Sequence, residues 1–234
     1  MSYWLYYWPS IPGRGEFVRL ALEDAGAPYV DVGRDQGATA VAQIMRNGEH
    51  FAPPILADES ESVSHVAHIL AWVSRPLELA PVDARDFRRM HQMQLTVTDF
   101  VAEIHDTHHP LGPSLYYDEQ KEVAARRSAV FISDRLPLFL DYFERVLTDN
   151  PDSGGWAIGH RCTTLDLSLF HVMRGLRYAF PNALAELETP ALDDLTRRIA
   201  RRRRIADYLD SERCIDFNED GVFRRYPELD RPDR

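Results

Sequence analysis

The chain has 234 residues, which suffices for one large or two small domains, and 44% of them are hydrophobic and 27% charged. These proportions are typical of a globular protein and exclude collagen-like, mucin-like and wholly disordered classes. With 27 basic against 37 acidic residues, the formal net charge is −10, and this negative field disfavours nucleic acid as a partner.

The cysteine content and the lack of long apolar runs indicate a cytoplasmic protein. Cys162 and Cys214 lie far apart, and no CxxC motif offers a zinc ribbon or a dithiol redox site. Without a disulfide framework, a reducing compartment is favoured. No segment approaches 18 uninterrupted apolar residues, and the apolar start, residues 1–8, is too short and lacks the basic residues of a signal peptide.

Residues 1–75 begin with a strand–helix–strand pattern. The aromatic run Tyr3–Trp8 stops at Pro9 and predicts a strand. A turn over 12–15 precedes a helix that ends near Gly26, and Tyr29–Val32 predicts a second strand. Strand, helix and strand within about 30 residues are typical of a βαβ unit.

The following segments complete a β-α-β-α-β-β-α order for this first unit. We expect a weak helix over 39–46, a strand at Phe51–Leu56, a short strand over 61–63 and a helix whose apolar face begins at Val66. Because proline cannot donate to a sheet ladder, Pro53–Pro54 must lie at a strand start or edge.

The pattern changes to helices after residue 75. We expect a thioredoxin-sized α/β domain over 1–75, a linker over 76–82, an all-helical domain over 83–217 and a peripheral C-terminal tail over 218–234. The helical periodicity occupies four segments, 83–109, 118–148, 164–180 and 191–210. The predicted fold class is therefore α/β plus all-α.

Four motifs in this order resemble the cytosolic glutathione S-transferases. Tyr7–Leu20 is similar to the family's first strand, active-site loop and first helix, and Phe51–Leu56 is similar to its cis-proline loop. Ser64–Leu70 resembles the turn and helix that hold glutathione, and Gly159 with Thr163–Asp166 resembles the family's helical-domain capping motif. The resemblance extends from Tyr3 to about Leu209.

Two further runs, His105–Pro110 and Phe223–Leu229, are similar to those of a bacterial, tyrosine-type subgroup. The resemblance implies a thioredoxin-like domain followed by a helical-bundle domain. It also implies a homodimeric detoxification enzyme that uses glutathione as cosubstrate, needs no metal and conjugates the glutathione thiolate to small apolar electrophiles.

Catalysis of this kind requires a group that favours the thiolate, because a free thiol has a pKa near 8.5. The resemblance offers two hydroxyl groups for this task, Tyr7 and Ser10, with Arg14 as a supporting positive charge. Tyr6 points to the opposite face of the strand from Tyr7, so both cannot serve one site. Taken as ordinary structural residues, Tyr7 is a core aromatic, Ser10 a turn former and Arg14 a solvated arginine.

The resemblance assigns glutathione binding to Pro53, Pro54, His65 and Val66. Pro54 fits the cis-proline of the family, but Pro53 then replaces a residue that normally offers an N–H. Either one hydrogen bond is missing, or Pro53 is the cis residue and Ala52 holds the tripeptide. At the next helix start the family has two polar residues, whereas this chain has His65 and Val66; the Val66 backbone N–H can still bind an anion.

His105, His108, Tyr116 and Tyr117 are candidates for the electrophile pocket. The alternatives are structural hydrogen bonding for the histidines and ordinary packing for the tyrosines. Although the i, i+3 spacing of His105 and His108 suits a shared ion, no second cluster supplies further ligands, so we expect no metal.

Two alternatives to conjugation remain at the level of sequence. The same thiolate could serve a glutathione-dependent isomerase, dehalogenase or peroxidase. The departures at Pro53 and Val66 also fit a non-catalytic binding protein with this fold.

Overall fold

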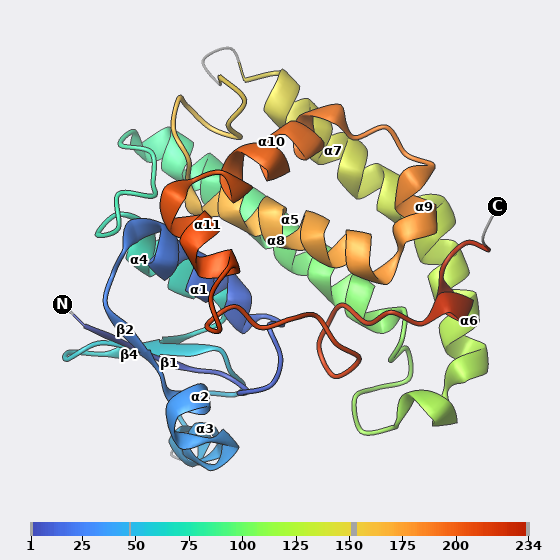
Figure 1. Ribbon diagram of the computed structural model, residues 1–234, viewed down its shortest axis with the longest axis horizontal. Coiled ribbons are helices and arrows are strands. Elements are labelled where there is room, and N and C mark those ends of the chain that lie inside the picture. The colour runs from blue at the N-terminus through green and yellow to red at the C-terminus, as the bar shows by residue number, and fades with distance from the viewer. Residues whose placement is uncertain (1, 47, 151–153, 233–234) are drawn as a thin grey trace.

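The computed structural model describes residues 2–46, 48–150 and 154–232. A small mixed sheet with its helices forms one part of the molecule, and a larger group of helices lies against it (Figure 1). This arrangement confirms the predicted α/β plus all-α fold, with a thioredoxin-like unit first.

The sheet has four strands in the order β2-β1-β3-β4. Strand β1 pairs in parallel with β2 and antiparallel with β3, and β3 pairs antiparallel with β4. The strands are β1 (Tyr3–Tyr6), β2 (Tyr29–Asp31), β3 (Ile55–Ala57) and β4 (Ser62–Ser64). The helices of this unit are α1 (Gly15–Ala25), α2 (Val32–Gln36), α3 (Ala38–Met45) and α4 (Val66–Ser74).

Side chains along β1 are alternately buried and partly exposed, so every second one enters the core. Tyr3, Leu5 and Tyr7 are buried, whereas Trp4 and Tyr6 are partly exposed. Tyr7 follows the last strand residue directly, and its carbonyl oxygen lies against Gly33 at the start of α2. A Cβ at Gly33 would lie 1.8 Å from that oxygen, so this close approach requires glycine.

The helical part is built around α8, which is buried along almost its whole length. Its longer helices are α5 (Ala84–Asp106), α6 (Lys121–Val130), α7 (Leu136–Thr148), α8 (Thr164–Ala179), α10 (Pro190–Ala200) and α11 (Arg203–Leu209). Shorter elements are η1 (Tyr117–Glu119), the π-helical turn η2 (Phe131–Arg135), α9 (Pro181–Ala185) and η3 (Pro227–Leu229). No helix in the described ranges is long and apolar enough to cross a membrane.

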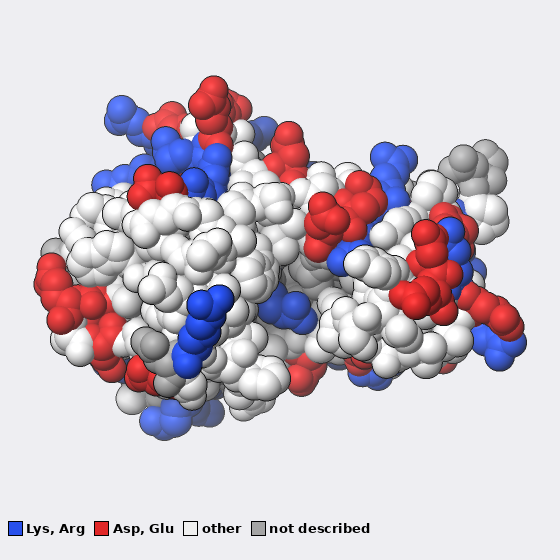
Figure 2. Space-filling view, turned by 90° about the horizontal axis from the view of Figure 1, so that it is seen from below, with Lys and Arg blue, Asp and Glu red and all other residues white. Residues whose placement is uncertain are grey.

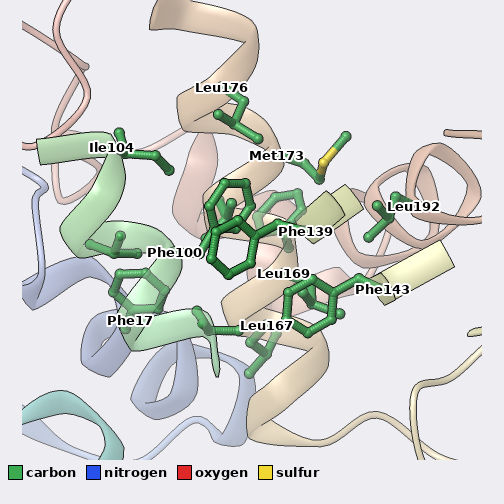
Figure 3. Packing of buried hydrophobic residues seen from close by; sticks show 14 of the residues in the cluster. Phe17, Phe100, Ile104, Phe139, Phe143, Leu167, Leu169, Met173, Leu176 and Leu192 are labelled. Atoms are coloured by element: carbon green, nitrogen blue, oxygen red, sulfur yellow. The ribbon is translucent and has the colours of Figure 1, made fainter. Parts of the chain in front are cut away.

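The larger of two apolar clusters among the described residues joins the two parts, and the smaller lies within the α/β part. Phe17 of α1 packs in the same cluster as Phe100, Phe139 and Leu167 of the helical part (Figure 3). The rings of Phe100 and Phe139 stack with their centroids 4.3 Å apart. Burial of this shared surface from water is the main force that holds the two parts together.

A buried polar network crosses the same joint. The Tyr208 hydroxyl of α11 donates to the Glu16 carboxylate of α1 at 3.0 Å, and Arg19 donates to Asp31 at 2.7 Å. Arg19 also lies 3.3 Å from the carbonyl oxygen of Pro12, so the network reaches the loop before α1.

The C-terminal tail is not peripheral along its whole length, contrary to the expectation from its polar sequence. Val222, Phe223 and Leu229 are buried. The Phe223 ring occupies the space over Gly175 in α8, where a Cβ would lie 2.3 Å from the ring. Residues 233 and 234 of the expected tail lie outside the described residues.

Candidate functional site

Tyr7 lies beneath the loop that connects β1 to α1. A Cβ at Gly13 would lie 2.4 Å from the Tyr7 hydroxyl oxygen, and a Cβ at Gly15 would lie 2.5 Å from the ring. Gly13 also has a φ of +43°, which glycine adopts more easily than other residues. The two glycines therefore let the loop close around the tyrosine.

The Tyr7 hydroxyl oxygen accepts a hydrogen bond from the Arg14 backbone N–H, with 2.9 Å between nitrogen and oxygen. Burial raises the pKa of Tyr7, although the Arg14 N–H and the charges of Arg14 and Arg19 oppose that rise. The phenol is therefore protonated at neutral pH. No group among the described residues accepts its proton. Tyr7 is 5% exposed, and it does not itself line the cavity described below.

Ser10 and Arg14 lie on the same loop but in different surroundings. Ser10 is exposed, and its carbonyl oxygen accepts a hydrogen bond of 2.8 Å from the Asn218 side chain. Arg14 immediately precedes α1, and its side chain lines a cavity between the two parts of the molecule. Of the two predicted hydroxyl groups, only Tyr7 has its oxygen held at the start of α1.

The cavity has a volume of about 240 Å³ and is bounded by the β1–α1 loop, the proline loop, the start of α4 and one face of α5. Its lining is mainly apolar. The lining residues are Arg14, Phe17, Phe51, Ala52, Pro53, Pro54, Ser64, His65, Val66, Gln94, Val97, Thr98 and Val101. An apolar cavity with a few polar groups is the usual form of a small-molecule site.

The proline loop and the start of α4 form one wall of this cavity. The peptide bond between Pro53 and Pro54 is cis, so Pro54 is the cis residue. His65 precedes α4 with a φ of +73°, an uncommon conformation for a non-glycine residue. Val66 is the first residue of α4, and a helix leaves its first N–H groups without intrahelical partners. The structure thus brings together Arg14 and all four predicted glutathione-binding residues.

The predicted electrophile-pocket residues do not line this cavity. His105 is partly buried, and its ring centroid lies 5.1 Å from that of His108. His108 is buried, with its Nδ1 2.5 Å from Nδ1 of His109 and its Nε2 3.0 Å from the carbonyl oxygen of Val222. Burial lowers the pKa of His108 to about 3 and that of His109 to about 4. The neutral His108 ring thus holds the C-terminal tail through Val222.

Tyr116 and Tyr117 lie at the start of η1, which follows the histidine run in the chain. Tyr116 is exposed, whereas Tyr117 is buried and stacks on Tyr226 with 3.8 Å between ring centroids. The Tyr117 hydroxyl donates to the Glu228 carboxylate at 2.9 Å. Within the described ranges, no group of three His, Cys, Asp or Glu side chains is placed to hold a metal ion.

Comparison with known families agrees with this architecture. Residues 105–212 match the family model described as the glutathione S-transferase C-terminal domain. Residues 105–212 are thus similar to a glutathione S-transferase C-terminal domain. The first 75 residues supply the mixed four-stranded sheet that precedes this domain in the glutathione S-transferase fold.

Solved structures show the same fold at low sequence identity. Prostaglandin synthase D of Nilaparvata lugens has a TM-score of 0.72 and 15% identity, covering 92% of this chain and 100% of that one. The Pi-class glutathione S-transferase of Onchocerca volvulus has a TM-score of 0.66 and 22% identity, covering 90% and 93%. No curated protein gives a significant match.

One residue of the cavity, Gln94, was not predicted from the sequence. Gln94 is buried in α5 and shares a cavity-lining helix face with Val97, Thr98 and Val101. Their spacing of three and four residues marks one face of a helix, but this pattern is equally typical of core packing. Only the position of α5 against the proline loop shows that this face borders a cavity.

Proposed function

We propose that this protein is a glutathione transferase of the tyrosine type, resembling the bacterial subgroup, that conjugates glutathione to small apolar electrophiles. The observation that supports this proposal is the Tyr7 phenol. Its oxygen is held by the Arg14 N–H, its proton has no acceptor within the described part of the chain, and its loop borders the apolar cavity.

The proposed role of Tyr7 is to donate a hydrogen bond to the glutathione sulfur. With a pKa near 8.5, only a few per cent of a free thiol is ionised at pH 7. A hydrogen bond to the thiolate and the nearby Arg14 charge both favour the ionised form. The thiolate then forms a carbon–sulfur bond with the electrophile while the leaving group departs with the bonding electrons.

The proposed position of glutathione follows the cavity wall formed by the proline loop and α4. Neither Pro53 nor Pro54 has an N–H, so these two residues can offer the tripeptide only their carbonyl oxygens. The N-terminus of α4 offers the Val66 N–H and a positive potential to the γ-glutamyl carboxylate, with His65 beside it. Figure 2 shows one basic group recessed between the two lobes of this face and another on the surface of the left lobe, with acidic groups mostly toward the edges.

The proposed electrophile site is the apolar part of the cavity, next to Phe17, Val97 and Val101. His105, His108, Tyr116 and Tyr117 remain candidates for the polar end of a longer electrophile. They lie outside the cavity wall, and the tail contacts of His108 and Tyr117 give these two residues a structural role as well.

The deciding experiment compares Tyr7→Phe, Tyr6→Phe and Ser10→Ala in the conjugation of an aryl halide. Tyr7→Phe should lower kcat/KM roughly 10- to 100-fold, because each unit of thiol pKa changes the thiolate population about tenfold. Tyr6→Phe makes the same chemical change on the other face of β1 and should have little effect, as should Ser10→Ala.

Titration of the bound thiol by ultraviolet difference absorbance tests the same mechanism directly. The thiol should ionise at lower pH in the wild-type complex than in buffer, and closer to the buffer value in the Tyr7→Phe complex. If Ser10→Ala rather than Tyr7→Phe removes the shift, the serine is the donor. If neither variant changes it, the hydroxyl mechanism is wrong.

Other functions of the same site have different signatures. An isomerase, dehalogenase or peroxidase would use the Tyr7-bound thiolate on other substrates, so a substrate panel distinguishes them from a transferase. The absent N–H groups at Pro53 and Pro54 favour one further candidate, a non-catalytic binding protein. Glutathione would then raise the melting temperature without turnover of any electrophile.

We also propose that the protein acts as a cytoplasmic homodimer. Phe51 is fully exposed next to the cavity wall, and a large apolar side chain in this position suits a protein interface. Sedimentation velocity measures the mass directly, and a monomer at micromolar concentration would refute the dimer.

A further inference from the structure

One peptide unit of the β1–α1 loop lies between Tyr7 and the central helix α8. Its N–H belongs to Arg14 and donates to the Tyr7 hydroxyl oxygen at 2.9 Å. Its carbonyl oxygen belongs to Gly13 and lies 3.0 Å from Nε2 of His171. This peptide bond is trans, so its carbonyl and its N–H point in opposite directions. The unit therefore joins the phenol on one side to the imidazole on the other.

The surroundings of His171 decide which ring nitrogen carries the proton. His171 is 0% exposed, and burial lowers its pKa to about 3, so the ring is neutral at physiological pH and has one N–H. A carbonyl oxygen can only accept a hydrogen bond, so the proton is on Nε2 and the ring donates to Gly13. Turning the ring over would place a carbon atom opposite this oxygen and lose the bond.

Aromatic rings hold this imidazole in place. The His171 ring packs edge-on against Phe17, with 4.7 Å between centroids, and edge-on against Phe223, with 5.4 Å. Phe217 stacks on it at 5.7 Å. His171 therefore offers its N–H to the loop from a fixed position in the core.

The peptide unit needs an external hold because its first residue must be glycine. A Cβ at Gly13 would lie 2.4 Å from the Tyr7 hydroxyl oxygen, so no larger residue fits over the phenol. Glycine gives the backbone more freedom than any other residue and has no side chain that could fix the peptide plane. The hydrogen bond from His171 restricts that freedom from the side opposite to Tyr7.

We propose that His171 is a positioning residue for the Tyr7 hydroxyl and acts through the Gly13–Arg14 peptide. This inference rests on the proposed transferase function and deepens it, because it names a residue that tunes the acidity of the bound thiol from outside the cavity. His171 is not among the residues that line the cavity, so its influence on the thiol must pass through the loop.

Two physical effects transmit the influence of His171 to the phenol. The bond to the carbonyl oxygen fixes the peptide plane and so the direction of the Arg14 N–H, and a hydrogen bond weakens steeply when its angle departs from linear. The same bond polarises the amide, which strengthens the next hydrogen bond in the chain by about 10–30%. A phenol that accepts a stronger hydrogen bond is itself a stronger donor to the thiolate.

Substitution of His171 tests the proposal on the bound thiol. His171→Leu removes the donor but keeps an apolar side chain, whereas His171→Gln keeps an N–H near the position of Nε2. In His171→Leu, the pKa of the bound thiol, measured by ultraviolet difference absorbance, should rise by about half a unit, and kcat/KM near pH 6.5 should fall about threefold. His171→Gln should restore both values. An unchanged thiol pKa in His171→Leu would overturn the proposal.

Phe223→Leu is the control for packing. It leaves a cavity beside the same imidazole and lowers the melting temperature, but it keeps the donor to Gly13. The pKa of the bound thiol should therefore stay at its wild-type value. If Phe223→Leu raises this pKa as much as His171→Leu does, loosened packing explains the effect and the positioning role is refuted.

A double-mutant cycle shows whether His171 acts through Tyr7. In the Tyr7→Phe background there is no hydroxyl to position, so adding His171→Leu should leave the pKa of the bound thiol unchanged. The same shift in both backgrounds would show that His171 reaches the thiol by another route, which contradicts the proposal.

NMR of the ligand-free protein separates this proposal from the transferase function. The Arg14 amide proton should move upfield in Tyr7→Phe, which removes its acceptor, and also in His171→Leu, but not in His171→Gln. In wild type, the nitrogen chemical shifts of His171 should show a proton on Nε2, and a proton on Nδ1 instead would overturn the proposal even if His171→Leu does not fold. If wild type does not lower the pKa of the glutathione thiol, the transferase function fails, and the Arg14 shifts still decide whether His171 positions the peptide.

Discussion

Arg14 contributes two separate groups to the proposed site. Its backbone N–H holds the Tyr7 hydroxyl, and its side chain lines the cavity. Arg14→Met removes the charge but keeps the backbone donor, so it isolates the electrostatic effect on the thiolate. We expect the pKa of bound glutathione to rise by about one unit, because a positive charge near an anion favours ionisation.

The rate–pH profile of conjugation measures this effect. In Arg14→Met, kcat/KM should fall roughly tenfold near pH 6.5 and approach the wild-type value above the shifted pKa. Arg46→Met is the control, since Arg46 is exposed at the end of α3. A loss of activity that is equal at every pH would show that Arg14 acts by positioning and not by charge.

At the scale of the element, the start of α8 is held by a reciprocal cap. Asp166 accepts the Thr163 backbone N–H at 2.8 Å and the Thr163 hydroxyl at 2.7 Å, and its other oxygen accepts the Ala157 N–H at 2.8 Å. The carboxylate therefore fixes both the first turn of the central helix and the loop before it.

Asp166→Ala would leave two buried backbone N–H groups without acceptors. We expect the free energy of unfolding, measured in urea, to fall by about 2–4 kcal/mol. The exposed Asp194 of α10 provides the control, and Asp194→Ala should change stability by less than about 0.5 kcal/mol. Equal effects of the two substitutions would refute the importance of the cap.

At the scale of the whole molecule, His171 connects three segments that are distant in sequence. Its Nε2 lies 3.0 Å from the carbonyl oxygen of Gly13, so α8 supports the loop over Tyr7. Its ring packs against Phe17 of α1 and Phe223 of the tail. Burial lowers the pKa of His171 to about 3.

This depressed pKa makes stability depend on pH. Between pH 6.5 and about 3, the unfolded chain binds a proton at His171 that the folded protein does not, so stability falls as pH falls. From urea midpoints at pH 7 and 4.5, wild type should lose roughly 2 kcal/mol more than His171→Gln. The exposed His68 offers the matched control His68→Gln. Parallel losses in wild type and His171→Gln would show that His171 is not responsible.

The sequence by itself determined the class of fold and the order of its elements. The aromatic run that becomes β1, the helical periods of α5 and α8 and the capping residues Thr163 and Asp166 all act over a few residues, so they leave a pattern that can be read locally. The motif at Pro53–Pro54 likewise indicated the cavity wall. It left open which residue is cis, because both peptide bonds precede a proline.

Tertiary structure decided the contacts between distant segments. His108 meets the Val222 carbonyl 114 residues away, and Gln94 meets Ser168 across 74 residues. No local pattern marks such pairs, since their side chains approach only after apolar surfaces have packed. For the same reason a polar tail could bury Phe223, and a glutamine on an ordinary helix face became buried beside Ser168. Burial and hydrogen-bond satisfaction are properties of the packed chain, whereas helix period and capping are properties of its neighbouring residues.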